Sequence, residues 1–301
     1  MINILIVAFY LFLGIVLQKV KALPNNTAGY LNNYLIYLVL PIIALRYIPA
    51  IVLSVELILP VLTVWLFFLA GWALISGIGR LYLWDKATIG CLILTVGLSN
   101  TSFLGFPIIE ALYGVEGLKI ALLVDQPGSF LLVSSLAIVV AAIYGEDKLR
   151  KRDISRKILF FPPFIFFLIS LAMNLMNLQI SGITEDLMDL IAMTLTPIAL
   201  IAVGLQIKIR SADLIQSPLL IGLGLSLIIA PALVYIFLGW ILNFEGLIFE
   251  VTVMEIAMPP MITASIIAIK FKLKPKLASL MVGVGIPLSL LTLSLWYLIL
   301  K

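Results

Sequence analysis

The sequence predicts an all-α membrane protein with ten transmembrane helices, arranged as a 5+5 inverted repeat with broken, crossing helices four and nine. Three observations predict this fold. Hydrophobic residues make up 63% of the 301 positions and charged residues only 11%. Apolar runs long enough to span a membrane recur along the whole chain. Two of these runs, one in each half, are interrupted at matching places by residues that break helices.

Composition excludes several classes of protein. The mean hydropathy of +1.23 means more apolar surface than a soluble domain can bury, so lipid must cover most of it. The chain has no His and a single Cys, Cys91, which argues against proton relays through imidazole, disulfides within the chain and thiolate metal sites. Glycine runs are not followed by the Lys-Ser/Thr of a phosphate loop. We therefore expect no enzyme, no metal site, no cofactor and no nucleic-acid partner.

Each apolar run is interpreted as one span, because about 20 apolar residues cross a bilayer as a helix. The first run has no positive charge before it and no small-residue cleavage site, so we interpret it as a retained helix rather than a signal peptide. Asp186 and Asp189 make the start of the seventh run the least apolar. In order, the ten runs are 2–18, 28–45, 57–79, 87–112, 117–143, 158–177, 183–205, 214–242, 247–269 and 277–299.

The distribution of charge predicts the orientation. With both termini outside, 16 of the 19 basic residues fall in cytoplasmic loops, six of them in the central loop 146–157. Only Arg46, Lys119 and Lys301 fall outside. Because cytoplasmic loops are enriched in Lys and Arg, we expect a multi-pass protein of the cell membrane with outside termini and a cytoplasmic central loop.

The two halves share spacings that predict an inverted repeat. Pro41 and Pro197 lie 156 residues apart in spans two and seven, and Pro60 and Pro218 lie 158 apart at the starts of spans three and eight. Five spans per half force the second half into the opposite orientation. The expected units are residues 1–145, the loop 146–157 and residues 158–301. Chance among abundant prolines is the competing explanation.

The two interruptions predict the binding site. Bare backbone groups are tolerated at membrane depth only where they are shielded by protein or line a cavity, and paired breaks mark the substrate site of many transporters. A half-helix that starts inside the membrane offers free N–H groups to an anion. The alternative for the polar side chains is an ordinary hydrogen bond between helices. The predicted substrate-binding residues are Asn100, Thr101, Ser102, Gly105, Pro107, Pro259, Pro260 and Thr263.

Two acidic residues lie deep within apolar runs, Asp125 in span five and Glu255 in span nine. Ionisable residues at such depth are functional candidates by default. No Lys or Arg lies at similar depth in the sequence, which favours a coupling cation or a protonated acid over a static ion pair. We therefore expect these residues, with Asn100, to bind a sodium ion or carry a proton.

The residues from Asn100 to Ile108 read Asn-Thr-Ser-Phe-Leu-Gly-Phe-Pro-Ile, and Leu112-Tyr113-Gly114 follow. This stretch resembles the fourth span of the auxin efflux carrier family, which includes bacterial and archaeal permeases. Met258-Pro259-Pro260 is similar to the ninth span of that family. The resemblance covers the whole chain, although the central loop is shorter than in many plant members.

The resemblance implies a fold similar to that of bile-acid sodium symporters. Spans three to five and eight to ten would form a transport core that moves against a scaffold of spans one, two, six and seven. Glu255-Ile256-Ala257-Met258 resembles the Glu-x-x-Met stretch that holds sodium in those symporters, which adds Met258 to the candidate ion ligands. Pro259 replaces a polar residue there. The resemblance also implies a homodimer.

From these observations we expect a secondary transporter that moves a small organic anion by alternating access. The substrate would be a carboxylate such as malate, malonate or an auxin-like acid, bound at the crossing of spans four and nine. Alternatives are a sodium- or proton-coupled symporter of another small organic solute and an anion channel. An intramembrane hydrolase using Asp125 and Glu255 is a remote third, because no protease motif is present.

Overall fold

The computed structural model describes residues 2–24, 26–145, 161–207 and 216–301, and in these ranges all regular secondary structure is helical. The predicted loop 146–157 lies outside them. Shorter apolar helices cover Leu5–Leu17, Lys86–Gly97 and Pro162–Leu175. The prediction of an all-helical protein with several membrane-spanning helices is confirmed. Six helices in the described ranges are long and apolar enough to cross a membrane: Thr27–Ala50, Val55–Leu81, Thr101–Tyr144, Ile183–Gln206, Ser217–Ile241 and Pro275–Leu300.

The helices begin and end within a few residues of the apolar runs. Several are built from shorter pieces joined by one wider, π-helical turn, such as Leu35–Val39 between α2 and α3. The helices of the first half are α1 Ile2–Leu17, α2 Thr27–Tyr34, α3 Leu40–Tyr47, α4 Ile58–Leu81, α5 Lys86–Gly97, α6 Phe106–Val124, α7 Leu131–Ser134 and α8 Leu136–Tyr144. Those of the second half are α10 Pro162–Leu175, α11 Ile183–Ala192, α12 Leu195–Gln206, α13 Ser217–Gly224, α14 Ala230–Tyr235, α15 Leu247–Ile256, α16 Ile262–Lys270 and α17 Pro275–Leu300.

Helix α6 is interrupted at Gly114, whose φ of 67° and ψ of −163° are not helical. Glycine adopts a positive φ at little cost because it has no Cβ. Thr101 and Ser102, before this turn, donate hydrogen bonds to Asp125, after it. The segment 101–125 therefore runs out to Gly114 and returns.

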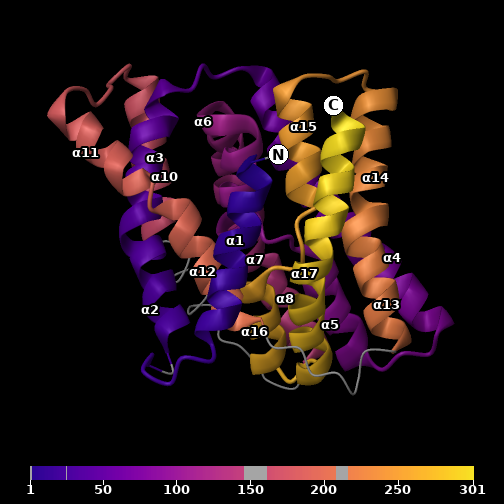
Figure 1. The fold of residues 1–301 in the computed structure, drawn as a ribbon. Helices are drawn as coiled ribbons and strands as arrows, with labels where there is room; N and C mark the ends of the chain where they lie inside the picture. Colours follow the sequence, from indigo (N-terminus) through magenta and orange to yellow (C-terminus); the bar gives the residue numbers. More distant parts are fainter. Residues whose placement is uncertain (1, 25, 146–160, 208–215) are drawn as a thin grey trace.

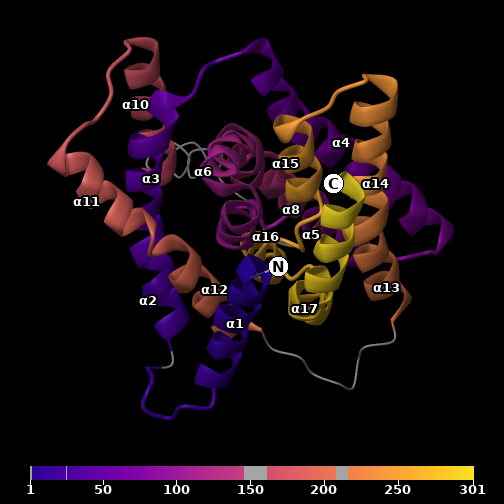
Figure 2. The same cartoon turned by 45° about the horizontal axis from the view of Figure 1, so that its top comes forward.

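The helices pack in two groups (Figures 1 and 2). The lateral group consists of α1, α2, α3, α10, α11 and α12. In it α12 packs on α1 and α2, and α3 packs on α10 and α11. The crossing group consists of α4 to α8 and α13 to α17. In it α5 packs on α4 and α8, α6 packs on α15, and α17 packs on α13 and α16. Both termini lie at the same end of the molecule, opposite α16 (Figure 1).

Close backbone contact holds α1 to α12. A Cβ atom added to Gly204 would lie 2.8 Å from the Cα of Gly14 and would also meet the carbonyl oxygen of Leu11. The side-chain amide of Gln18 donates through Nε2 to the carbonyl oxygens of Gly204 and Ile207, at 2.7 and 2.9 Å. These hydrogen bonds satisfy acceptors at the end of α12. Small residues thus let these two helices approach within the membrane.

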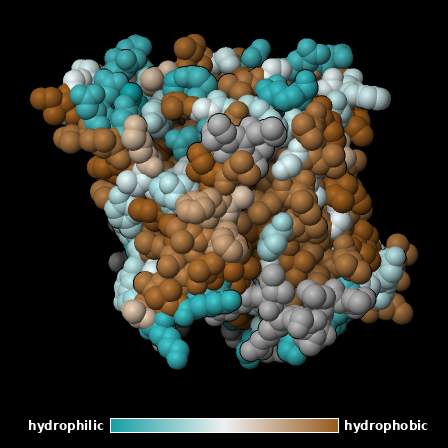
Figure 3. Space-filling model, in the orientation of Figure 1, coloured by the Kyte–Doolittle hydropathy of each residue, from teal (hydrophilic) through white to brown (hydrophobic). Residues whose placement is uncertain are grey.

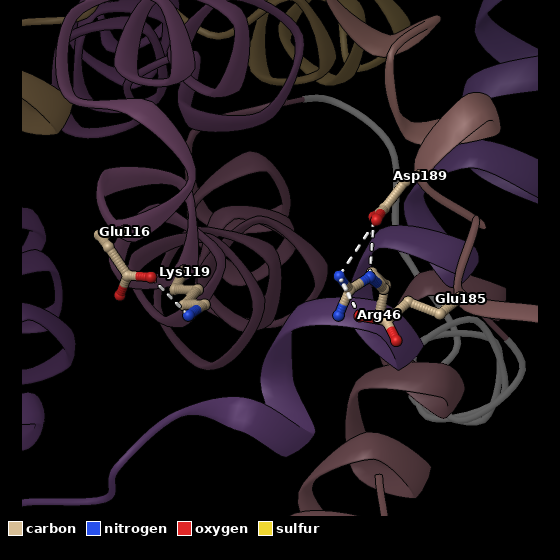
Figure 4. A network of polar contacts seen from close by, with 5 residues as sticks. All are labelled: Arg46, Glu116, Lys119, Glu185 and Asp189. Carbon is tan, nitrogen blue, oxygen red and sulfur yellow. Dashed lines mark hydrogen bonds and ion pairs between the residues drawn. The ribbon is translucent and has the colours of Figure 1, made fainter. Parts of the chain in front are cut away.

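An ion-pair network joins α3 to α11 (Figure 4). The guanidinium of Arg46 donates to both carboxylate oxygens of Asp189, at 2.7 and 3.1 Å, and lies 2.7 Å from Glu185 Oε1. Elsewhere in the same view, Lys119 pairs with Glu116 on α6 at 2.6 Å. All three basic residues predicted to lie outside are paired with acids, since Lys301 Nζ also lies 2.9 Å from Glu250 Oε2.

The surface is apolar between its two ends. On the face seen in Figure 3, hydrophobic residues form a broad belt and hydrophilic residues gather at the top and the bottom. Large apolar side chains such as Leu66, Ile228 and Leu291 are more than half exposed. Such a belt suits contact with lipid.

Candidate functional site

The two interrupted segments meet backbone to backbone. The N–H of Asn100 donates to the carbonyl oxygen of Pro259 at 2.8 Å, and the N–H of Met261 donates to that of Leu98 at 2.9 Å. Ser99 and Pro260 form an antiparallel bridge. Each break thereby satisfies backbone groups of the other, which is what a helix interruption inside lipid requires.

The sequence of each break explains where the helices stop and restart. Helix α5 ends at Gly97, and Leu98 is extended. The helix resumes at Thr101 with the wider turn Thr101–Gly105, which continues directly into α6, and Pro107 follows that turn. Pro259 and Pro260 cannot donate hydrogen bonds, so the chain after α15 cannot continue as a helix there. The hydroxyl of Ser99 donates to Ile256 O at 3.0 Å, at the end of α15.

Asp125 is buried and satisfied. Its Oδ1 accepts hydrogen bonds from the hydroxyls of Thr101, at 2.6 Å, and Ser102, and its Oδ2 accepts one from Gln126 Nε2 at 2.9 Å. Its exposed fraction is 2%. The carboxylate therefore sits at the beginning of the half-helix that starts at Thr101, where the helix dipole favours negative charge.

Glu255 is buried and not satisfied. Neither carboxylate oxygen has a hydrogen-bond partner among the described residues, and the side chain is fully buried. It lies against Gly105, where an added Cβ would be 2.5 Å from Oε2 and 2.9 Å from Oε1. Within the described chain, Asn100 Nδ2 is a second polar atom at the meeting point that is buried without a partner.

A cavity of about 760 Å³ opens beside the meeting point. Its polar wall includes Ser102, Asp125, Gln126 and Thr263. None of the described residues that line it is basic. Apolar and aromatic side chains make up most of the remaining wall: Ile36, Leu40, Phe103, Phe130, Val133, Ile138, Phe161, Pro162, Met261 and Ile267, together with Tyr37 and Ser134.

Helix α16 begins at this wall. Its first backbone hydrogen bond runs from Ser265 N–H to Met261 O at 3.1 Å, so the N–H groups of residues 262–264 have no acceptor within the helix. Thr263 is exposed, and both it and Met261 line the cavity. The positive end of the α16 dipole therefore lies at the cavity wall, and no acidic residue of the described chain is hydrogen-bonded to it. The half-helix that starts at Thr101 differs, because Asp125 accepts hydrogen bonds from Thr101 and Ser102 there.

The structure brings the predicted site residues together around one point but does not place them all in the cavity. Ser102, Thr263 and Asp125 line it. Asn100, Thr101, Gly105, Pro107, Glu255, Met258, Pro259 and Pro260 are buried around the meeting point and are not part of its wall.

Sequence reasoning missed the aromatic part of the wall. Tyr37 and Phe130 come from two different helical turns and Phe161 precedes α10, and nothing in the sequence distinguishes them from residues that face lipid. Phe130 stacks on Phe161 with ring centroids 4.3 Å apart. Gln126 was not assigned a role either, although a second polar residue next to Asp125 in an apolar run was a usable signal.

The amino-acid sequence matches a known protein family and two relatives. The family model described as "Membrane transport protein" matches residues 1–297. An uncharacterized transporter of Methanothermobacter thermautotrophicus is 31% identical, over 73% of this chain and 72% of the relative. The uncharacterized transporter MJ1031 of Methanocaldococcus jannaschii is 26% identical, over 97% of this chain and 96% of the relative. The chain therefore belongs to the membrane transport protein family of the auxin efflux carriers, as the motif around Asn100 predicts.

Proposed function

We propose that this membrane transporter is a secondary transporter that carries a small organic anion by alternating access. The observation that carries the proposal is the antiparallel meeting of two interrupted segments at the wall of a cavity of about 760 Å³. Paired breaks of this kind occur in transporters built from inverted repeats, with substrate sites near the bilayer midplane.

The proposed architecture is ten spans in a 5+5 inverted repeat, with spans four and nine crossing at the two breaks. Two inverted halves would present their equivalent segments to each other in opposite directions, and the bridge between Ser99 and Pro260 is antiparallel. Ser99 and Ile256, which are hydrogen-bonded, lie 157 residues apart, close to the spacing of the proline pairs. The halves would be residues 1–145 and 158–301.

The lateral group would be the scaffold and the crossing group the moving core. The cavity lies between them, because Tyr37 and Phe161 belong to segments of the lateral group while Ser102, Asp125 and Thr263 belong to the crossing group. If the central loop is cytoplasmic, Ile138 and Ile267 lie toward the cytoplasmic end of the cavity, and the structure represents an inward-facing state.

The substrate carboxylate would bind at the start of α16. Free N–H groups and the dipole of a helix favour an anion at this position, and the Thr263 hydroxyl stands beside it. The other half-helix start is already occupied by Asp125. Ser102 lies on the same wall. Behind this wall, Asn100 Nδ2 has no hydrogen-bond partner in the described chain and could donate to a carboxylate that enters more deeply than Ser102. Phe130 and Phe161 would contact an apolar body of the substrate.

The charges at the site require a positive partner for an anion. The cavity wall holds Asp125 and, among its described residues, no Lys or Arg. An ionised Glu255 without donors would carry a large desolvation cost. Glu255 and Asp125 would hold a proton or a sodium ion, with Asn100 and Met258 close by in the sequence and fold. The bound cation would offset the repulsion between Asp125 and an anionic substrate and the desolvation cost of Glu255. Transport would then be coupled to the gradient of that cation. A second carboxylate on the substrate would add a penalty, which favours monocarboxylates.

The acidic cavity also favours one second candidate, a coupled transporter of a neutral or cationic organic solute. Uptake by purified protein in liposomes separates the two. Labelled mono- and dicarboxylates and organic amines are offered under imposed sodium, proton or potential gradients.

The proposal expects uptake of a monocarboxylate, driven by sodium or protons and lost in Glu255→Gln. The control Glu116→Gln removes an exposed acid far from the cavity and keeps uptake. Uptake driven by potential alone and indifferent to Glu255→Gln would remove Glu255 from the coupling site. Uptake restricted to amines would establish the second candidate.

A further inference from the structure

A hydrogen bond joins the two helix groups on the side of the crossing away from the cavity. Thr196 Oγ1, in the first turn of α12, donates to Glu110 Oε2, on α6, at 2.7 Å. Helix α12 belongs to the lateral group and α6 to the crossing group. The carboxylate also lies at a helix start, where unpaired N–H groups and the helix dipole stabilise negative charge.

The other side-chain hydrogen bonds and ion pairs between helices of the described residues join members of one group. Aromatic rings also pack between the groups on the cavity side, where Phe130 contacts Phe161 and Phe164. In the lateral group Tyr34 bonds to Thr194 at 3.1 Å and Gln18 to Gly204 at 2.7 Å. In the crossing group Trp296 Nε1 donates to Leu227 O at 3.0 Å. Further pairs within one group are Arg46–Asp189, Asn174–Ile51, Trp65–Pro127, Ser99–Ile256 and Lys274–Asp85. If the groups move as bodies, the hydrogen bonds and ion pairs within each group persist, whereas the Glu110–Thr196 hydrogen bond between the groups must break.

The bond and the cavity lie toward opposite ends of the molecule. Glu110 lies on the part of α6 that runs from the crossing to Gly114, whereas Ile267, in the cavity wall, lies on α16. Helix α6 is in the upper part of Figure 1 and α16 in the lower part. A hollow of about 210 Å³, lined by Ile6, Glu110, Ala111 and Thr196, marks the seam between α1, α6 and α12.

We infer that the Glu110–Thr196 hydrogen bond is a latch that holds the outer seam closed while the cavity is open at the other end. The inference rests on the proposed function, because alternating access requires one side to be closed while the other is open. Breaking the bond is then part of each transition to the outward-facing state. A ligand or a substitution shifts the equilibrium between the inward-facing and outward-facing states only if it changes their free energies by different amounts. The latch contributes such a difference, because it stabilises the inward-facing state alone.

The latch has a measurable size. A hydrogen bond to a charged group would stabilise the state with the closed outer seam. Its loss should therefore raise the population with an open outer seam by roughly tenfold. Thr196→Val removes the hydroxyl and keeps the shape of the side chain. Thr196→Ser keeps the hydroxyl and should restore the closed seam.

Cysteine labelling reports whether the seam is open. Ala199 is fully buried and lies one turn beyond Thr196 on α12. In a Cys91→Ala background, Ala199→Cys gives a single thiol, and its reaction rate with a maleimide is measured in reconstituted vesicles that contain both orientations. The matched control is Thr252→Val, since the buried Thr252 hydroxyl donates to Ile248 O at 2.6 Å within α15.

We expect Thr196→Val and Glu110→Leu to label roughly tenfold faster than the parent, and Thr196→Ser and Thr252→Val to label at the parent rate. Equal rates in all variants would overturn the latch, and so would equal acceleration in the Val and Ser variants, because shape rather than the hydrogen bond would then matter. If Thr196→Val fails to insert, Glu110→Leu decides the question.

Acid uptake is followed in the same vesicles. If the parent moves no acid, the proposed function fails but the labelling comparison still stands. If the parent takes up acid and the Thr196→Val and Glu110→Leu variants are labelled at the parent rate, the latch is wrong and the proposed function stands.

Discussion

Gly105 and Glu255 are packed so closely that no side chain fits between them. A Cβ on Gly105 would lie 2.5 Å from Glu255 Oε2 and 3.0 Å from its Cδ. Gly105 belongs to the half-helix after the first break, and Glu255 is one residue from the end of the helix before the second. The packing of the turn Thr101–Gly105 against α15 therefore depends on the absence of a side chain at position 105 and on a buried carboxyl group at 255.

This relationship predicts that Gly105→Ala abolishes uptake while the protein still inserts. Forcing a methyl group into a packed interior costs about 1–3 kcal/mol, and here it displaces the acid proposed to bind the coupling ion. Liposome uptake and thermal unfolding in detergent measure the two effects. The double variant Gly105→Ala/Glu255→Asp should regain stability, because the shorter acid leaves room. Wild-type uptake by Gly105→Ala would contradict the proposed packing.

Asp125 should contribute strongly to stability because it accepts three side-chain hydrogen bonds. Asp125→Ala leaves Thr101, Ser102 and Gln126 without their acceptor, at about 1–3 kcal/mol for each buried group that finds no other partner. Asp125→Asn keeps an acceptor oxygen and should lose clearly less. The midpoint of thermal unfolding ranks the two variants against wild type, and an Ala variant as stable as the Asn variant would show that these bonds contribute little.

The contact between α1 and α12 should not tolerate a larger residue at Gly204. A Cβ there would meet the backbone of α1 at Leu11, Gly14 and Ile15, which cannot yield as a side chain can. We expect Gly204→Ala to destabilise the protein by about 1–3 kcal/mol. Gly77→Ala is the matched control, since a Cβ at Gly77 meets nothing within 4 Å. It should be neutral or slightly stabilising, because Ala favours helix over Gly by about 1 kcal/mol.

Acid should weaken a contact between two loops. Asp85, before α5, accepts the N–H of Thr88 at 2.8 Å and pairs with Lys274, before α17, at 2.6 Å. Partial burial raises the pKa of Asp85, but the hydrogen bonds from Lys274 and Thr88 outweigh it, so the pKa lies below its ordinary value. A lowered folded-state pKa means that this stabilisation is complete above the ordinary Asp pKa of about 3.9 and is lost as pH falls further.

Thermal unfolding measured against pH tests this linkage. In Lys274→Met the part of the acid destabilisation due to the ion pair should disappear, leaving a shallower fall in stability below about pH 4. The effect should be small, because both side chains are about half exposed. An unchanged pH profile would show that the pair is not coupled to folding.

Much of this protein follows from local properties of the sequence. Long apolar runs determine where helices lie, since a helix needs about 20 apolar residues to cross the bilayer. Gly97 and the pair Pro259-Pro260 mark where two of the helices stop, because proline cannot donate a hydrogen bond and glycine weakens a helix. The motif around Asn100 was sufficient to indicate the family, which the family model confirms.

Only the tertiary structure decided how these pieces meet. Asp125 and Glu255 look alike in the sequence, each a single acid in an apolar run. The fold gives Asp125 three donors and gives Glu255 none within the described chain, only the bare backbone of Gly105. The aromatic wall of the cavity likewise gathers Tyr37, Phe130 and Phe161 from three segments. Hydrophobic length and helix breaking are set by neighbours along the chain, whereas hydrogen-bond partners and cavity walls depend on which distant residues are packed side by side.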